Sequence, residues 1–332
     1  MMEAVIRQAR ERGATDIHVT AGEPIRFRVR GRLERTEYVA ESAVWQDWWQ
    51  GLLTEAERSL LATAGAVEVA PASGMRVALY RTDGAVAGAI RLLSPLAALP
   101  PDPNPDLLGR AAEVTGGLVL IGGATGSGKT TTLWRIVEII NATRPVHVIS
   151  LEDPPEYRLP SQAACIHQRG IGTDVPDWET GLVSALREDP DVLVIGELRT
   201  AGTVAAALRA AQTGHLVLAT LHAGSAEAVI GRLVHMFALG GQEEIRYQLA
   251  SALQLLIVQQ LVPLVQVQAV VREWVWRNPA MVTLVRDGKE HQMAAYLQTM
   301  GDQAQTWEQS RQQFLTAGLA AADAAVLRGW RP

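Results

Sequence analysis

Apolar and polar residues alternate along the first hundred residues in patterns that predict a small mixed α/β domain. Helical spacing of apolar residues occurs in two segments, residues 3–13 and 44–61, the second rich in tryptophan. Period-two alternation, typical of a half-buried strand, occurs at residues 25–33, which follow the segment 14–20, and two more strand-like runs lie within 75–93. Turns are expected at Gly31 and at Thr82-Asp83-Gly84. We therefore expect a curved sheet with flanking helices over residues 1–96.

A proline-rich segment separates this region from the rest of the chain. Five prolines follow one another closely, at Pro95, Pro100, Pro101, Pro103 and Pro105. Proline fixes φ and restricts the residue before it, so we expect an extended, semi-rigid linker at residues 97–106. A chain of 332 residues also exceeds the usual size of one hydrophobic core, which favours two domains.

Beyond the linker, strand-like and helical segments alternate. Short apolar runs occur at residues 118–121, 146–151, 191–195 and 216–221. This alternation predicts a mostly parallel sheet flanked by helices, within a second domain at residues 107–332. Two amphipathic helices are expected next, at residues 225–237 and 243–261. The second has an apolar stripe, and the last hundred residues are predicted to be largely helical. The stripe consists of Leu249, Ala252, Leu253, Leu256 and Ile257.

The segment Gly123–Thr130 fits the phosphate-binding pattern G-x-x-x-x-G-K-[ST]. It lies between an expected strand and an expected helix, so its backbone N–H groups meet a helix N-terminus, where phosphate is favoured. A glycine-rich turn that matches by chance is the alternative, and this context disfavours it. In the pattern, Lys129 reaches the β- and γ-phosphates and Thr130 holds Mg²⁺. We expect ATP and Mg²⁺ to bind at Gly123, Ala124, Thr125, Gly126, Ser127, Gly128, Lys129, Thr130 and Thr131.

Two of the apolar runs lead into acidic residues. The run 191–195 is followed by Glu197, as in a Walker B element, and the run 146–151 is followed by Glu152. Parallel strands end at the same edge of a sheet, where a nucleotide sits. Glu197 is therefore expected near Mg²⁺, and Glu152 is a candidate general base for the attacking water. A single acid at a loop start is usually only solvated, but two beside a phosphate loop favour the catalytic interpretation.

Two histidines, His215 and His222, bracket the strand expected at 216–221. At opposite ends of a strand they are too far apart to share a metal ion. His222 lies at the nucleotide edge, where it is a candidate sensor of the γ-phosphate. A structural role is the ordinary alternative for a lone histidine, and we expect one for His215.

Composition narrows the classes of function. A formal net charge of -5 argues against a chain built mainly to hold polyanions such as DNA. Cys165 is the only cysteine, which excludes a disulfide framework and a four-cysteine zinc site and fits a reducing cytosol. The N-terminus has no apolar signal region. The longest apolar stretch, Leu253–Val271, contains glutamines and a proline and is too polar for a membrane span.

Four sequence boxes, taken together, resemble the secretion-superfamily ATPases, the motors of type IV pili, type II secretion and related conjugative or type IV secretion systems. The boxes are the Walker A loop and three further segments in family order. The N-terminal Thr-Asp-Ile-His at 15–18 also resembles the start of the family's PAS-like domain. The three segments are an Asp box at 151–157, a Walker B region at 186–199 and a His box at 213–222.

This resemblance implies a fold and a set of roles. It implies a PAS-like N-terminal domain followed by a RecA-like P-loop domain with a helical C-terminal region. Glu152 corresponds to the catalytic glutamate and Glu197 to the Walker B glutamate on the metal side. The family forms hexamers, in which the N-domain supplies arginines to the neighbouring subunit's nucleotide. The candidates for this role in trans are Arg76, Arg81 and Arg91.

Within the family, the resemblance favours the retraction ATPases of twitching motility. The chain begins directly at the PAS-like domain, lacks the tetracysteine of assembly ATPases, and has a retraction-like motif at residues 280–292. Val282 and Thr283 depart from that motif, and Thr200 stands where the family usually has Asp. We expect a cytoplasmic homohexamer, peripherally associated with the inner membrane through a platform protein, that drives pilin removal.

Other functions stay open at this point. The same ring could power pilus extension or conjugative secretion. A RecA-like nucleic-acid motor would share the core sheet, but it needs basic or aromatic strand-binding loops, and the acidic balance argues against direct nucleic-acid binding. A ring partner that binds ATP without hydrolysing it is a further alternative.

Overall fold

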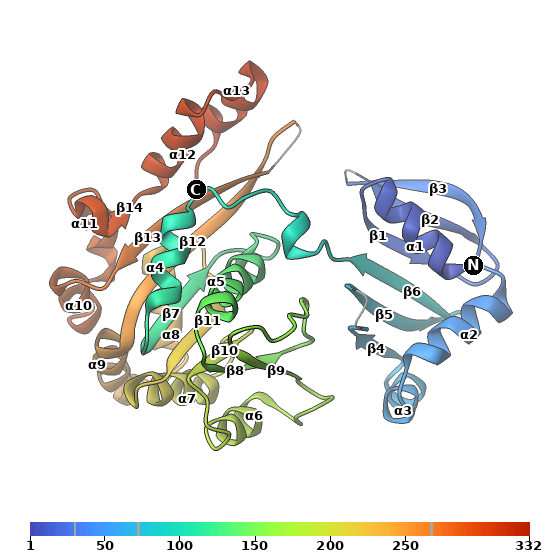
Figure 1. The fold of residues 1–332 in the computed structure, drawn as a ribbon, viewed down its shortest axis with the longest axis horizontal. Helices are drawn as coiled ribbons and strands as arrows, with labels where there is room; N and C mark the ends of the chain where they lie inside the picture. The colour runs from blue at the N-terminus through green and yellow to red at the C-terminus, as the bar shows by residue number, and fades with distance from the viewer. Residues whose placement is uncertain (30, 72–73, 266–267) are drawn as a thin grey trace. The chain divides into compact units, whose positions relative to one another are not determined.

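The structure of the chain is a computed structural model that describes residues 1–29, 31–71, 74–265 and 268–332. It divides into two compact units, each built around its own sheet (Figure 1). The first unit comprises Met1–Leu99 together with the short segment Pro154–Arg158, and the second comprises the remaining residues. Among the described residues, no helix combines the length and the apolar character that a membrane crossing requires.

The N-terminal unit contains one antiparallel sheet in the order β3-β2-β1-β6-β5-β4. Its strands are β1 Ala14–Val19, β2 Pro24–Val29, β3 Arg32–Val39, β4 Ala66–Val69, β5 Met75–Thr82 and β6 Ala85–Leu92. Its helices are α1 Met2–Glu11, α2 Ser42–Leu52, α3 Glu55–Ala64 and the short 3-10 helix η1 Leu96–Ala98.

Alternation along the strands builds the core of this unit. In β2, Ile25 and Phe27 are buried while Arg26 between them is exposed. The run predicted as one strand at 25–33 covers all but the first residue of β2 and the first two residues of β3, with Gly31 at φ 79° and residue 30 outside the described residues. Asp83 and Gly84 both have positive φ and form the predicted turn between β5 and β6.

The helical stretch predicted at 44–61 is two helices rather than one. Leu53 at the end of α2 has an extended backbone, and α3 begins after it. Thr54 accepts a hydrogen bond from the Glu57 amide, and the Glu57 side chain bonds back to the Thr54 amide. This capping box starts a new helix within an otherwise helical pattern.

The second unit contains an eight-stranded sheet in the order β14-β13-β12-β7-β11-β10-β8-β9. The strands from β12 to β9 are parallel, and β13 and β14 are antiparallel. Its strands are β7 Gly117–Gly122, β8 His147–Glu152, β9 Cys165–Gly170, β10 Val192–Ile195, β11 Leu216–Leu221, β12 Leu253–Pro263, β13 Gln268–Trp276 and β14 Ala304–Gln305.

Helices connect these strands, as the predicted alternation requires. The longest is α5, which begins at the end of the phosphate loop. The α-helices are α4 Pro105–Glu113, α5 Lys129–Thr143, α6 Trp178–Ala185, α7 Ala201–Gln212, α8 Ala226–His235, α9 Gln242–Ala252, α10 Pro279–Arg286, α11 Met293–Leu297, α12 Trp307–Thr316 and α13 Ala321–Gly329. The 3-10 helices are η2 Leu239–Gly241, η3 Glu290–Gln292 and η4 Gly301–Gln303.

The prediction of one helix over 243–261 is wrong. Helix α9 ends at Ala252, and β12 then runs beside β7 and pairs with β13 in a hairpin whose residues 266 and 267 lie outside the described part. Of the apolar positions that suggested a helical stripe, Leu249 and Ala252 lie on α9, whereas Leu253, Leu256 and Ile257 are buried in β12, a central strand. A strand buried on both faces is almost continuously apolar, so its pattern also satisfies helical spacing. The expectation of a largely helical last hundred residues does not hold over this hairpin, whereas residues 277–332 contain the helices α10 to α13 and the short strand β14.

Part of the predicted linker is held against the second unit. Helix α4 begins at Pro105, where the missing N–H of proline is not needed. Asp102 forms ion pairs with Arg272 and with Arg135 of α5, at 3.4 Å for the second. The last residues before α4 are therefore fixed by side-chain contacts.

Candidate nucleotide site

The phosphate loop joins the buried strand β7 to helix α5. Gly123, Gly126 and Gly128 all have positive φ, which side chains rarely adopt. A Cβ on Gly123 would lie 2.3 Å from Ser127 Oγ and 2.5 Å from the Gln259 carbonyl oxygen, whereas one on Gly126 would meet nothing within 4 Å. The base of the loop is closely packed, and its tip, with Ala124 and Thr125 exposed, is open.

Two polar groups of this loop fit a bound triphosphate. Lys129 is 7% exposed, and its ammonium donates to the carbonyl oxygens of Gly123 at 2.9 Å and Ala124 at 2.8 Å. The Ser127 hydroxyl is buried and has no hydrogen-bond partner among the described residues. An ammonium and an unpaired hydroxyl beside a helix N-terminus match phosphate oxygens. Thr130 and Thr131, both half-buried, follow in the first turn of α5.

The Walker B acid lies two residues beyond the end of β10. Gly196 donates its amide to the Leu151 carbonyl of β8 at 2.8 Å and accepts from the Thr220 hydroxyl of β11. These bonds hold the backbone between two neighbouring strands. The Glu197 carboxylate then accepts from Arg199 Nε at 2.9 Å and lies 3.4 Å from His222 Nε2.

His222 connects Lys129 to Glu197. Its Nδ1 lies 3.4 Å from Lys129 Nζ, and its Nε2 faces Glu197. Burial and the positive charge of Lys129 lower the pKa of His222 below its ordinary value of 6.5. A neutral ring can accept from the ammonium at Nδ1 and donate from Nε2–H to the carboxylate. The structure thus brings together three of the residues that the sequence predicts for the site.

Glu152 is held rigidly at the end of β8. Its carboxylate accepts from Ser150 Oγ at 2.8 Å, Trp134 Nε1 at 3.0 Å and Gln168 Nε2 at 3.3 Å, and the residue is 3% exposed. A Cβ on Gly196 would lie 3.4 Å from the Glu152 Cα, so the glycine lets the Walker B backbone pass close to this acid. Helix α5 and strand β9 both contribute to its position.

Sequence reasoning missed a buried polar network behind the loop. Gln259 of β12 donates to the Ser127 carbonyl at 2.7 Å and accepts from the Thr132 hydroxyl at 2.8 Å. Arg272 of β13 donates to the same Gln259 side chain at 3.2 Å and to Asp102. The prediction of a helix at 243–261 concealed these contacts. The available signal was a pair of glutamines inside an otherwise apolar run.

The three arginines proposed to act in trans have different surroundings. Arg76 pairs with Glu68 at 2.7 Å and Glu156 at 3.0 Å. Arg91 pairs with Asp16 at 3.0 Å, although its side chain is 63% exposed. Arg81 is exposed, and its side chain has no ion-pair or hydrogen-bond partner within the described part of the chain. His215, by contrast, bonds to the Ala210 carbonyl at the end of α7, at 3.0 Å.

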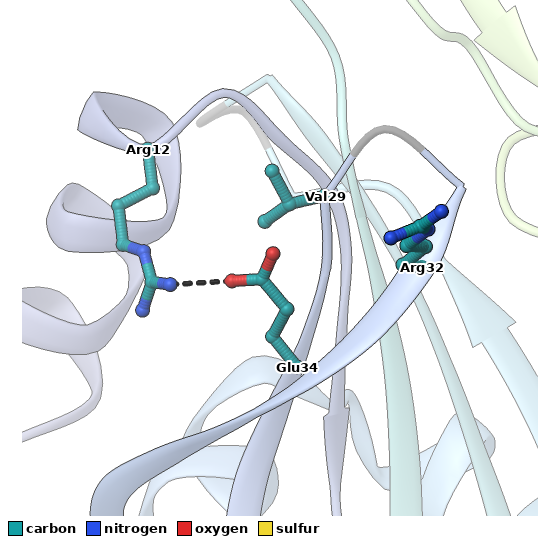
Figure 2. Close-up of a pocket in the computed structure, with 4 residues that line it drawn as sticks. All are labelled: Arg12, Val29, Arg32 and Glu34. Atoms are coloured by element: carbon teal, nitrogen blue, oxygen red, sulfur yellow. Dashed lines mark hydrogen bonds and ion pairs between the residues drawn. The ribbon is translucent and has the colours of Figure 1, made fainter.

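A separate hollow of about 680 Å³ lies in the N-terminal unit. Figure 2 shows the side chains that line it, with Arg12 and Glu34 pointing toward each other in an ion pair. None of its lining residues belongs to the predicted nucleotide site. The lining residues are Arg12, Val29, Arg32 and Glu34.

A phosphate loop between a buried strand and a helix, with acids at the ends of neighbouring parallel strands, defines a P-loop nucleotide-binding protein. Residues 96–313 match the family described as Type II/IV secretion system protein. The chain belongs to this family, is an ATPase, and has the expected architecture of an N-terminal domain followed by a P-loop ATPase domain.

Individual relatives resemble the chain over most of its length. It is 36% identical over 306 residues to the uncharacterized protein YggR of Escherichia coli, covering 90% of this chain and 93% of that protein. It is 33% identical to the type IV pilus retraction ATPase PilT of Pseudomonas aeruginosa, covering 88% and 87%. The crystal structure of the pilus retraction motor PilT with bound ADP matches with a TM-score of 0.84 and 34% identity, covering 97% and 95%.

Proposed function

We propose that the chain is the subunit of a cytoplasmic homohexameric ATPase that drives pilus retraction at an inner-membrane platform protein. The cluster of Lys129, His222 and Glu197 carries this proposal, because it links the phosphate loop to the Walker B acid through contacts of 3.4 Å. The similarity to a pilus retraction motor along nearly the whole chain supports the use of that chemistry for retraction.

Each residue of the cluster has a distinct task in ATP hydrolysis. Lys129 exchanges its bonds to two loop carbonyls for the β- and γ-phosphate oxygens. Thr130 and Glu197 would hold Mg²⁺, which neutralises charge on the phosphates when it is bound. His222, which lies 3.4 Å from both Lys129 and Glu197, senses whether the γ-phosphate is in place.

Glu152 acts as the general base in this proposal. It accepts the proton of the water that attacks the γ-phosphorus, while ADP leaves with the electron pair of the broken bond. A base must be aimed accurately, and the bonds from Ser150, Trp134 and Gln168 fix the carboxylate. Since Trp134 lies on α5, the base and the phosphate loop are attached to the same helix.

Arg81 is the residue that we assign to the neighbouring subunit's nucleotide. Negative charge builds on the γ-phosphate oxygens during the reaction, and a guanidinium stabilises it with a planar fork of donors. Arg76 is held by two carboxylates of its own unit, whereas Arg81 has no carboxylate partner among the residues that the structure describes. An arginine supplied in trans makes hydrolysis depend on the subunit interface, which a ring needs in order to move.

Phosphate release by the purified chain tests the proposal directly. Glu152→Gln keeps the size of the side chain but removes the base, so we expect kcat to fall by about 10²- to 10⁴-fold with the KM for ATP little changed. Glu113→Gln, at the exposed end of α4, is the matched control and should leave turnover unchanged. Full turnover in Glu152→Gln would remove this residue from its assigned role.

A second experiment distinguishes retraction from its sibling functions. Pilus extension or conjugative secretion would use the same ATPase core. Val282 and Thr283 depart from the retraction motif, and Thr200 stands where the family usually has Asp. Deleting the gene should leave cells with excess pili if the motor retracts them. Lost pili or lost transfer would assign the motor to extension or secretion. Turnover that requires DNA would favour a nucleic-acid motor instead.

A further inference from the structure

Three potential metal ligands meet at the edge of the second sheet, at the ends of strands opposite to Glu152. His147 is the first residue of β8, and Cys165 and His167 lie on the edge strand β9. His147 is paired in register with Cys165, and Cys165 and His167, two residues apart, lie on one face of the strand. One ligand atom from each of the three residues lies within 4.8 Å of the other two.

Hydrogen bonds orient His147 toward this cluster. Its Nδ1 lies 3.0 Å from the carbonyl oxygen of Asp189, which can only accept, so Nδ1 carries the hydrogen. Nε2 therefore has the lone pair, and it lies 2.8 Å from Nδ1 of His167. Histidine ligands of metals usually donate their second ring N–H to a carbonyl or carboxylate in this way. The Asp189 contact gives His147 the tautomer that a metal ion requires.

A cluster held only by its own hydrogen bonds is the ordinary alternative. The separation of 2.8 Å between His147 Nε2 and His167 Nδ1 satisfies one such bond, but Cys165 Sγ lies 4.0 Å from His167 Nε2. In a tetrahedral zinc site, ligand atoms lie about 3.3 to 3.6 Å apart. Small side-chain rotations reach these values, and Cys165 and His167 are exposed, so water can complete the coordination.

We propose that His147, Cys165 and His167 bind one Zn²⁺ ion. Thiolate and imidazole ligands select zinc over magnesium, which prefers oxygen ligands. On binding, the Cys165 thiol releases its proton to solvent and its sulfur bonds to the metal, while both imidazoles bind through ring lone pairs. Zinc binding here does not rest on the motor role proposed above, because none of the three ligands belongs to the nucleotide site.

The position of the ion makes it structural. Glu152 lies five positions after His147 along β8, which is about 17 Å at the usual rise of a strand. The ion would instead join the edge strand β9 to β8. Strand β9 also carries Gln168, whose amide donates to Glu152 at 3.3 Å. A zinc ion at this edge therefore steadies the strand that helps to position the proposed base.

Zinc titration of the full chain, without a histidine tag and after chelation under reducing conditions, tests the site. Competition with a chromophoric chelator should give one Zn²⁺ per chain, and zinc should raise the melting temperature. Cys165→Ser and His167→Gln should each weaken binding at least tenfold, that is by about 1.4 kcal/mol or more. His291→Gln, an exposed histidine of η3, is the matched control and should bind zinc like the wild type.

One spectroscopic and one chemical measurement use the wild-type chain and therefore do not depend on how well the variants fold. Co²⁺ bound to the wild-type chain should show thiolate-to-metal charge-transfer absorption, and Zn²⁺ should protect Cys165 from alkylation. Cobalt binding without a thiolate band would overturn the proposal. Zinc affinity that is unchanged in Cys165→Ser, or that falls equally in His291→Gln, would also overturn it.

Discussion

His222 lies between a cation and an anion, and its protonation follows from that position. A neutral ring accepts from Lys129 and donates to Glu197 at the same time, whereas a charged ring has no acceptor for the ammonium. Burial and the charge of Lys129 lower its pKa, so the neutral form prevails at neutral pH. One side chain can therefore respond to changes in both the phosphate loop and the Walker B acid.

Thr200 shows how a departure from a family pattern can preserve local structure. It stands at the N-cap of α7, directly after Arg199, and its hydroxyl accepts from the Thr203 amide at 3.2 Å. Thr and Asp both serve as N-caps because each has an oxygen within reach of that amide. The substitution thus retains the cap but removes a negative charge near Arg199.

Glu273 is a buried acid that does not belong to the nucleotide site. It lies on β13, is 7% exposed, and accepts a hydrogen bond from the amide of Ala226 at the start of α8. Burial raises its pKa from 4.5 to about 7, and the bond from Ala226 offsets only part of this effect. The carboxyl group is therefore protonated in the folded chain at pH values where the unfolded chain has lost the proton.

We expect Glu273→Gln to remove a pH dependence of stability. In the wild type, the stability that protonated Glu273 gives to the folded chain is fully present below about pH 4.5. It is lost as pH rises through about 7. The loss amounts to as much as about 3 kcal/mol in the free energy of unfolding. Urea unfolding at about pH 5 and pH 8 measures it, and the glutamine variant should be the more stable protein at the higher pH.

A matched substitution controls for the change of a surface charge. Glu243→Gln, in the exposed first turn of α9, should follow the wild-type pH dependence. Parallel stability curves for the wild type and Glu273→Gln would show that the buried carboxyl titrates as it does in the unfolded chain.

At the scale of elements, the sequence predicts what depends on local pattern. The strands β7, β8, β10 and β11 follow from short apolar runs, and the loop before α5 follows from its fixed glycines and lysine. Strand β12 could not be predicted in this way, because its burial between β7 and β13 depends on pairing across more than a hundred residues. For the same reason, Gln259 and Arg272 were not recognised behind the loop.

The hairpin of β12 and β13 connects the linker to the phosphate loop. Arg272 is fully buried, bonds to Asp102 at 2.7 Å, and shares Gln259 with Thr132 of α5. Burial raises the pKa of Asp102, but the hydrogen bonds and charge of Arg272 outweigh this and lower it below 3.8. The linker therefore contains a charged group, Asp102, that is paired with Arg272 and Arg135.

Replacing Asp102 by asparagine should destabilise the chain by about 3 kcal/mol, because a buried guanidinium would lose its counter-charge. The paired replacement Asp102→Leu with Arg272→Met removes both charges and should recover most of this loss. Denaturant unfolding compares the two. Asp106→Asn, exposed in the first turn of α4, controls for loss of a carboxylate nearby. A double variant no more stable than Asp102→Asn would mean that packing, not charge pairing, dominates.

At the scale of the whole molecule, the chain length and the proline-rich segment predicted two domains, and the four sequence boxes predicted an ATPase. The structure contains one chain, so the assembly is a proposal. An arginine that acts in trans is expected to have no carboxylate partner within its own subunit. Arg81 fits this description among the described residues, whereas Arg76 and Arg91 have carboxylate partners. If Arg81 acts in trans, mixing two inactive variants can restore activity, whereas an arginine that acts in cis would not allow this.

Mixing two inactive variants should restore activity. Lys129→Ala disables a subunit's own phosphate loop, and Arg81→Ala disables the site of its neighbour, so each ring alone should lose at least 10²-fold in turnover. In rings assembled from equal amounts of both, about a quarter of the interfaces join an intact loop to an intact arginine, if assembly is random. Phosphate release should then recover to roughly that fraction of the wild-type rate.

The same experiment separates Arg81 from general effects of arginine loss. Arg7→Ala, on the exposed face of α1, should keep full turnover alone. Subunits of Lys129→Ala mixed with the double variant Lys129→Ala with Arg81→Ala should stay inactive, because no intact loop is present. If the arginine acted in cis, the mixture of single variants would also stay inactive, since every subunit would lack one of its two groups. Recovery therefore requires that one subunit completes the site of the next, which is the property a ring uses to pass each hydrolysis step to its neighbour.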